Sequence, residues 1–224
     1  VNSCFIIIPA FNEQAVLEQV VAGIRQVSPA EIVLVDDGSE PPLQVPAAGG
    51  VHLLRHCVNL GQGAAIATGI TYALEQGAAL IITFDADGQH DAADLAALTA
   101  PVLSGEVDIT LGSRFLDTRN QVPPGRRLLI FCARCFHFLL ARTWMTDAHN
   151  GLRAMNRKAA TKISIRENRM AHATEIILEI KRNKLAWKEV PVHISYTEYS
   201  LRKGQRASNG LRIFFDVVLH KLFR

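Results

Sequence analysis

Short apolar runs alternate with amphipathic segments along the first half of the chain. Apolar and β-branched residues fill five runs that are typical of buried strands, at 4–8, 31–35, 51–55, 79–84 and 107–112. Between them, apolar residues recur at helical spacing, which predicts helices over 13–27, 59–76 and 91–103. Strands that alternate with helices in this way predict an α/β fold, in which helices flank a Rossmann-like, mostly parallel sheet.

The pattern becomes less regular after residue 113. A polar loop is predicted at 116–125, a polar turn at 147–153, a helix at 171–184, a strand at 187–194 and a basic amphipathic terminal helix within 206–224. The stretch 126–145 is apolar but carries several arginines. It is either a core helix whose arginine stems reach solvent, or an interfacial helix that lies on lipid, and the similar terminal helix favours the second interpretation.

Polar side chains follow three of the predicted strands. Asp85 and Asp87 come directly after the central run, the pair 36–37 follows the second run and the pair 12–13 follows the first. In open α/β sheets, ligands bind at the carboxyl ends of the strands, so these clusters lie where a site is expected. A single cluster of this kind is an ordinary turn, but three clusters at three strand ends favour a site.

Asp85 and Asp87 suggest the chemistry of that site. Two carboxylates held close together repel each other, and burying them unpaired is costly. A divalent cation relieves the repulsion, and oxygen ligands suit Mg²⁺ or Mn²⁺. Such a cation usually also holds substrate phosphates, so we expect metal and phosphate to meet at the end of the central strand.

Composition narrows the class of protein. The chain has 224 residues, 49 % of them hydrophobic, which suits one domain with a substantial core. A net charge of +3 does not indicate a nucleic-acid binder. Of the Lys and Arg residues, only Arg25 and Arg55 lie in the first 110 positions. The basic second half therefore predicts an anionic partner, either phosphate or a membrane surface.

Several other classes are disfavoured. The glycines at 61, 63 and 69 do not have the dinucleotide-binding spacing, and no P-loop sequence is present. Cys132 and Cys135 form an isolated C-x-x-C in an apolar stretch, so free thiols and a reducing compartment are expected. No apolar run approaches the roughly 18 residues of a spanning helix, and no signal peptide is recognised.

Short motifs spread over almost the whole chain resemble those of a known family. In order they are residues 9–13 (PAFNE), 35–39 (VDDGS), 59–63 (NLGQG), 85–90 (DADGQH), 112–114 (GSR), 147–153 (DAHNGLR), 189–192 (EVPV) and 202–204 (RKG). Each motif is weak alone, but the ordered set resembles the family 2 glycosyltransferases of the GT-A fold. The resemblance is greatest to the dolichyl-phosphate mannose synthase branch, which includes bacterial polyprenyl-phosphate glycosyltransferases.

The resemblance implies a donor site in residues 1–112. The residues implied to bind the nucleotide sugar there are Pro9, Ala10, Glu13, Asp36, Asp37, Gly61 and Asp85. Among them, Asp37 would contact the base, and Asp36 would support the loop that carries it. Asp85, Asp87 and Gln89 would hold Mg²⁺ or Mn²⁺, with the two aspartates as the family's D-x-D motif.

Residues 113–205 would form the acceptor side of the same domain. Asp87, Arg114, Arg127 and Asp147 are the implied catalytic residues, with Arg114 and either Arg126 or Arg127 facing phosphates. Arg202 and Lys203 would close over the donor on a flexible loop. A lipid phosphate acceptor is already an anion and needs no strong base, whereas a sugar hydroxyl needs one.

Asp147, Glu175 and His149 are the candidates for such a base. Helix capping or a surface ion pair is an equally good interpretation of these three residues. The choice between them therefore depends on the acceptor.

The predicted function is inverting, metal-dependent transfer of a hexose from a UDP- or GDP-linked sugar to a polyprenyl phosphate. The expected location is the cytoplasm, at the inner face of the cell membrane. Transfer to a sugar hydroxyl in surface polysaccharide synthesis is the alternative acceptor chemistry. A non-catalytic nucleotide-sugar-binding module is the alternative outside the enzymes, and the intact set of Asp85, Asp87, Gln89 and Arg114 argues against it.

Overall fold

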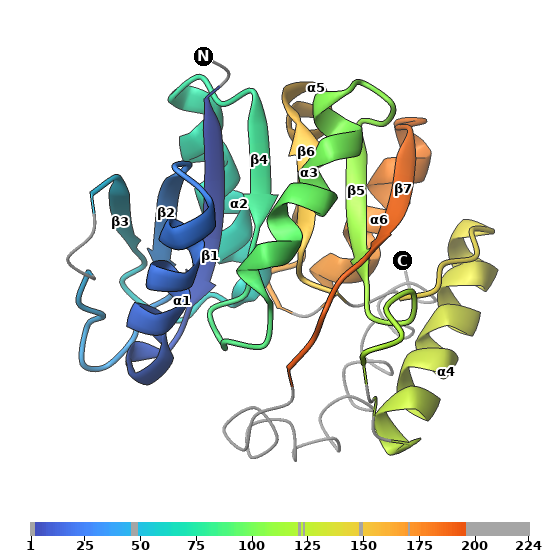
Figure 1. Cartoon of the computed structure of the whole chain (residues 1–224), viewed down its shortest axis with the longest axis horizontal. Helices are drawn as coiled ribbons and strands as arrows, with labels where there is room; N and C mark the ends of the chain where they lie inside the picture. The colour runs from blue at the N-terminus through green and yellow to red at the C-terminus, as the bar shows by residue number, and fades with distance from the viewer. Residues whose placement is uncertain are drawn as a thin grey trace.

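The structure is a computed structural model, and it describes residues 3–45, 49–120, 122, 124–147, 150–169 and 171–195. The predicted roles of His149, Arg202 and Lys203, and the predicted terminal helix in 206–224, lie outside these residues. Figure 1 shows a central sheet with helices on both faces. The predicted α/β class is therefore confirmed.

The described residues form one seven-stranded sheet with the order β3-β2-β1-β4-β6-β5-β7. Its strands are β1 Cys4–Ala10, β2 Glu31–Asp36, β3 Val51–Arg55, β4 Leu80–Thr83, β5 Ile109–Ser113, β6 Arg153–Asn156 and β7 Trp187–Pro191. Only β6 runs antiparallel to its neighbours, β4 and β5, and the other pairs in this sheet are parallel. The carboxyl ends of β1, β2, β4, β5 and β7 consequently meet at one edge.

The helices follow the strands in the order that the alternation predicts. They are α1 Gln14–Val27, α2 Gln62–Glu75, the 3₁₀ turn η1 Ala92–Asp94, α3 Leu95–Leu103, α4 Pro124–Ala141, α5 Arg157–Lys162 and α6 His172–Arg182. In Figure 1, α1 and α3 lie in front of the sheet, α2 and α6 lie behind it, and α4 stands at the side of β7. No helix in the described ranges is long and apolar enough to cross a membrane.

Two apolar clusters fill the space between the sheet and its helices. Successive side chains of a strand point to opposite faces, so Ile6 and Ile8 pack with α1 and α3, while Ile7 packs with α2. Gly69 lets α2 approach the sheet closely, because a Cβ atom there would lie 2.3 Å from Ile7 Cγ2. Since β1 and β4 are buried on both faces, their ends are held rigidly.

The five strands predicted in the first half are present, with ends that differ from the predicted ones by at most two residues. The strand predicted at 187–194 ends at Pro191, although Ile194 forms an isolated bridge with His90. The stretch predicted as 126–145 is helical over Pro124–Ala141.

The elements β6 and α5 were not predicted, and the turn expected at 147–153 leads directly into β6. A four-residue strand followed by a six-residue helix is too short to give a clear periodic signal. The sequence pattern therefore missed the strand that joins β4 to β5.

Candidate active site

The loops that follow β1 and β2 are tied together by buried polar groups. The carboxylate of Asp36 is fully buried and accepts hydrogen bonds from the backbone of Ser39 at 2.9 Å and of Leu43 at 3.2 Å. The Ser39 hydroxyl accepts a hydrogen bond from the backbone of Asn12 at 2.9 Å. Asp36 thus lies where it can support the loop, as the resemblance implies.

Asp37 organises the segment that leads into α2. Its carboxylate accepts hydrogen bonds from the backbone of Leu60 at 3.0 Å and of Gly61 at 2.7 Å, and from the ring of His56 at 2.7 Å. Gly61 has a φ of +107°, which favours glycine, and its Cα faces the backbone of Asn168. These partners occupy Asp37 inside the protein, so its contact with a nucleotide base stays a prediction.

Pro9, Ala10 and Glu13 lie beside these loops. Ala10 pairs with Asp36 in the parallel register of β1 and β2, and its carbonyl accepts a hydrogen bond from the Asp37 backbone at 2.9 Å. All three predicted residues are buried, Glu13 at the start of α1. The structure therefore brings this part of the predicted donor site together at one edge of the sheet.

Asp85 follows β4, and both of its carboxylate oxygens have partners within the protein. Gln62 at the start of α2 donates to Oδ1 at 2.8 Å, and the His90 ring contacts Oδ2 at 3.1 Å. Burial by itself would raise the pKa of Asp85. The hydrogen bond and charge of His90, together with the charges of Arg153 and His172, outweigh that effect and hold the pKa below its usual value.

Asp87 and Gln89 face each other on the next turn of the loop. The Asp87 carboxylate accepts hydrogen bonds from the Gln89 backbone at 3.1 Å and from its side-chain amide at 2.8 Å. Both residues are half-buried, unlike the enclosed aspartates on the loop after β2. Asp85 is half-buried as well, so all three predicted metal ligands are less enclosed than Asp36 and Asp37.

The donor atoms in this loop suit a magnesium-like ion with few protein ligands. Within the described residues, no three His, Cys, Asp or Glu side chains gather into a metal-binding group. Mg²⁺ usually takes one or two carboxylates and completes its shell with water and substrate phosphates. The carboxylates of Asp85 and Asp87 and the Gln89 amide oxygen fit that pattern, with Asp85 held by Gln62 and His90 and Asp87 held by Gln89.

The acceptor-side residues Arg114 and Asp147 form a buried ion pair. Arg114 Nε donates to Asp147 Oδ2 at 2.6 Å, and the Arg114 backbone donates to the same oxygen at 3.1 Å. Both side chains are almost fully buried. The ion pair joins the end of β5 to the loop before β6 and so gives the end of β5 a fixed, charged neighbour.

Arg153 is a site residue whose role the sequence did not reveal. It lies on β6, paired with Thr83 of β4, and is buried within electrostatic reach of both Asp85 and Asp147. Burial lowers the pKa of its guanidinium, and the two carboxylates oppose that shift. Among the described residues, its Nη1 has no hydrogen-bond partner. Arg153 therefore links the donor-side and acceptor-side carboxylates electrostatically.

Gln62 and His90 were also missed as partners of Asp85. Both stand inside motifs that the sequence displays, but neither motif shows that they converge on one carboxylate. Gly151 leaves room for the Asp85 carboxylate, since a Cβ atom at position 151 would collide with Asp85 Oδ2. The only available signal was their occurrence in the motifs at 59–63 and 85–90.

Two predicted residues lie apart from this cluster. Arg127 is exposed on α4. Glu175, a candidate base, accepts hydrogen bonds from the backbones of Arg166 and Glu167 at 2.8 and 2.9 Å. Glu175 therefore holds the loop between α5 and α6, which is neither helix capping nor an ion pair.

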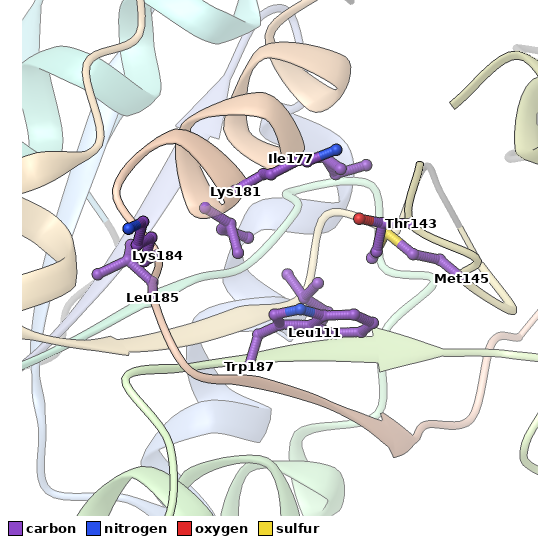
Figure 2. A pocket seen from close by; sticks show the side chains of 9 residues that line it. Leu111, Thr143, Met145, Ile177, Lys181, Lys184, Leu185 and Trp187 are labelled. Carbon is purple, nitrogen blue, oxygen red and sulfur yellow. The ribbon is translucent and has the colours of Figure 1, made fainter. Parts of the chain in front are cut away.

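A separate apolar pocket lies between α6 and the strands β5 and β7 (Figure 2). Its volume is about 90 Å³, and it is lined by Leu111, Thr143, Met145, Ile177, Ile180, Lys181, Lys184, Leu185 and Trp187. None of the predicted site residues is among them. One of its lining residues, Met145, precedes Asp147 of the acceptor-side ion pair by two residues in the sequence.

Comparison with known proteins identifies the class. Residues 5–164 match Glycosyl transferase family 2. The chain is 30 % identical to a UDP-N-acetylglucosamine–dolichyl-phosphate N-acetylglucosaminyltransferase of Methanococcus voltae, covering 97 % of this chain and 96 % of that protein. It is 28 % identical to a polyprenol monophosphomannose synthase of Mycolicibacterium smegmatis, covering 92 % and 82 %.

The fold is shared with a solved structure. Glucosyl-3-phosphoglycerate synthase from Mycobacterium tuberculosis, crystallised with Mn²⁺, UDP and glucosyl-3-phosphoglycerate, superposes with a TM-score of 0.64 at 15 % identity, covering 90 % of this chain and 74 % of that chain. The protein belongs to glycosyl transferase family 2. It is a glycosyltransferase with the predicted GT-A fold, and its relatives fit the predicted polyprenyl-phosphate branch.

Proposed function

We propose that this glycosyltransferase moves a hexose from a nucleotide-diphospho sugar to a polyprenyl phosphate, in a metal-dependent and inverting reaction. The observation that carries the proposal is the meeting of two charged groups at one sheet edge. The accessible Asp87–Gln89 pair follows β4, and the buried Arg114–Asp147 pair follows β5. Relatives named for lipid phosphate acceptors support the choice of acceptor.

The donor would lie along the ends of β1, β2 and β4. Pro9, Ala10, Glu13 and the loop built by Asp36 and Asp37 would enclose the nucleoside. Asp87 and Gln89 would hold Mg²⁺ or Mn²⁺, which when bound stabilises the negative charge that develops on the departing nucleoside diphosphate. Asp85 would keep its orientation through Gln62 and His90.

The acceptor would approach from the side of β5. Arginine suits phosphate because its planar group binds two oxygens at once, and the predicted phosphate-facing residues are Arg114 and Arg127. Asp147 accepts a hydrogen bond from the Nε of Arg114 and so fixes the orientation of the guanidinium. With a phosphate acceptor, Asp147 would orient Arg114 and would not be needed as a base.

A lipid acceptor requires contact with a membrane, and α4 has a suitable surface. Leu128, Phe131 and Phe138 are 65 %, 49 % and 46 % exposed on this helix, and Trp144 just beyond it is 50 % exposed. Arg134 stacks on the Trp144 ring at 4.9 Å from its centroid. Exposed aromatic and basic residues together favour the membrane–water interface. This surface supports the proposal that the enzyme works at a membrane, which we propose is the inner face of the cell membrane.

Donor turnover with and without the lipid tests the proposal. Release of sugar from UDP- and GDP-linked hexoses should require Mn²⁺ or Mg²⁺ and should yield a glycosylated lipid when polyprenyl phosphate is present. Asp87→Ala should lower turnover by about 100-fold or more, since a metal contributes several kcal/mol to such reactions. Asp91→Ala is the matched control, because Asp91 only caps the turn η1 through Ala93 at 2.9 Å.

Three outcomes would contradict parts of the proposal. Full turnover in EDTA would exclude the metal role. Transfer only to sugar hydroxyls would replace the acceptor with the glycan alternative. Nucleotide binding in a calorimeter without any sugar release would favour a non-catalytic binding module.

A further inference from the structure

We infer that Glu189 is a positioning residue for the transfer reaction, acting through Asp147, and this inference rests on the proposed function. Glu189 lies on β7, three strands from the metal-binding loop, and has no role assigned from the motif that contains it. Its side chain points to the same sheet face as Trp187, because alternate residues of a strand share a face. The loop before β6 lies on that face.

The Glu189 carboxylate binds two consecutive backbone amides of this loop. Oε1 accepts hydrogen bonds from Thr146 N at 2.8 Å and from Asp147 N at 3.0 Å, and Oε2 accepts from Thr146 N at 2.9 Å. The Thr146 hydroxyl donates to Oε1 at 2.7 Å. Hydrogen bonds to an ionised acceptor are about twice as strong as neutral ones, so they hold the loop tightly.

A chain of hydroxyl groups connects this contact to β5. Ser113 Oγ lies 2.6 Å from Thr146 Oγ1, and because Thr146 donates to Glu189, the Ser113 hydroxyl donates to Thr146. Ser113 is fully buried and directly precedes Arg114. The clamp formed by Glu189, Thr146 and Ser113 therefore joins β7, the loop and the end of β5.

The clamp determines where Asp147 meets Arg114. Glu189 holds the backbone nitrogen of Asp147, and Arg114 holds its Oδ2 through two hydrogen bonds of 2.6 and 3.1 Å. Asp147 is thus fixed at both ends within a buried space. A shift of this loop would turn Arg114 away from the position at which it faces a phosphate.

A carboxylate is the required group at position 189. Its partners in the clamp are all donors, namely two backbone N–H groups and one hydroxyl. A glutamine would turn its NH₂ group toward one of these donors and lose part of the clamp. The Glu189 and Asp147 carboxylates repel each other, and only these donors and the charge of Arg114 offset that repulsion. A residue that merely filled space at position 189 would not need to be a glutamate.

Glu189→Gln tests the inference, with Glu106→Gln as the matched control. Glu106 is exposed and pairs with Lys188 at 2.8 Å beside the same strand, but it does not contact the loop. Glu189→Gln should lower kcat by about 100-fold, the effect of misplacing a reacting group by about 1 Å. The KM for the nucleotide sugar should stay unchanged, because the donor lies at β1, β2 and β4. Equal kcat in both variants would overturn the inference.

A second measurement tests the clamp without depending on enzyme activity. In an NMR spectrum, the Arg114 Nε–H resonance is assigned by its loss in Arg114→Lys. Its chemical shift should move toward the value of exposed arginines in Glu189→Gln and should not change in Glu106→Gln. An unmoved resonance would overturn the inference even if the enzyme were inactive. If the wild-type chain transfers no sugar, the proposed function fails, and this resonance still decides whether Glu189 positions Asp147.

Two further variants separate positioning from stability. Thr146→Val removes one hydroxyl from the clamp and should lower kcat by about tenfold with the same direction of resonance shift. Asp147→Asn combined with Glu189→Gln should be no slower than Asp147→Asn alone, because both changes disturb one interaction. If the fold-losses of kcat in the two single variants multiply in the double variant, Glu189 acts independently of Asp147 and the inference is overturned.

Discussion

At the scale of single residues, Asp108 shows how a buried carboxylate supports the fold away from the site. It accepts hydrogen bonds from Asn156 at 3.0 Å, from Lys158 at 2.9 and 3.0 Å, and from the Ala186 backbone at 3.0 Å. Burial by itself would raise the pKa of Asp108, but these partners outweigh it and lower the pKa. Asp108 therefore joins β5, α5 and the segment before β7.

The sign of this shift predicts a pH dependence of stability. A lowered pKa in the folded state stabilises the protein above the unfolded pKa of about 3.9, and this contribution is lost as pH falls through the folded value. Asp108→Asn should reduce the free energy of unfolding at pH 7 by about 1–3 kcal/mol. The decrease in the free energy of unfolding between pH 7 and pH 3 should be smaller in this variant than in the wild type. Urea unfolding across this range measures both effects. Exposed Glu18→Gln is the control, and an equal effect there would contradict the prediction.

At the scale of elements, the contact between α2 and β1 depends on Gly69. A Cβ atom would meet Ile7 Cγ2 at 2.3 Å, and Ile7 is fully buried, so the helix must move outward to admit it. Gly69→Ala should lower the free energy of unfolding by about 1–3 kcal/mol, the usual cost of overpacking. It should also weaken nucleotide binding, because an outward movement of α2 would displace Gly61 and Gln62 at its start, which belong to the proposed donor site.

The control for this change is another helical glycine. A Cβ atom at Gly23 in α1 meets nothing within 4 Å, so Gly23→Ala should be neutral or stabilise the protein by up to about 1 kcal/mol. Chemical unfolding and calorimetry of nucleotide binding compare the two variants. A stabilised Gly69→Ala protein would show that the close approach of α2 is not required.

At the scale of the whole molecule, the exposed surface of α4 predicts membrane binding. Leu128→Asp with Phe131→Asp should reduce binding to vesicles that contain anionic lipid by about tenfold or more, since each removes an apolar group worth about 1.5–3 kcal/mol when buried. Sedimentation with vesicles measures the effect. Leu103→Asp, exposed at the end of α3, is the control and should bind as wild type. An equal loss of vesicle binding in Leu103→Asp would show that binding depends on exposed apolar residues in general and not on the surface of α4.

The layered fold could be predicted because its signals are local. The five runs of the first half became β1 to β5. A buried parallel strand must be apolar along its whole length, which explains β1, β2, β4 and β5, whereas β3 is a partly exposed edge strand. The strand β6 could not be found in this way, because its four residues begin with an arginine and end with an asparagine and so form no apolar run, unlike the equally short β4. Pairing with β4 and β5 is what makes it a strand. The edge that carries the candidate site was predicted, because strands end where polar residues begin.

The partners of each candidate residue depended on the tertiary structure. Asp36, Asp37, Asp85 and Asp87 look alike as acidic residues after strands, and all four accept hydrogen bonds within the protein, yet Asp36 and Asp37 are enclosed whereas Asp85 and Asp87 are half-buried. Arg153 approaches Asp85 because antiparallel β6 pairs with β4, a contact between residues about 70 positions apart. Periodicity carries information over a few residues, whereas these contacts arise from the packing of distant strands. The chain alone thus determined the layers and the polar edge, and only packing decided which carboxylates remain accessible there.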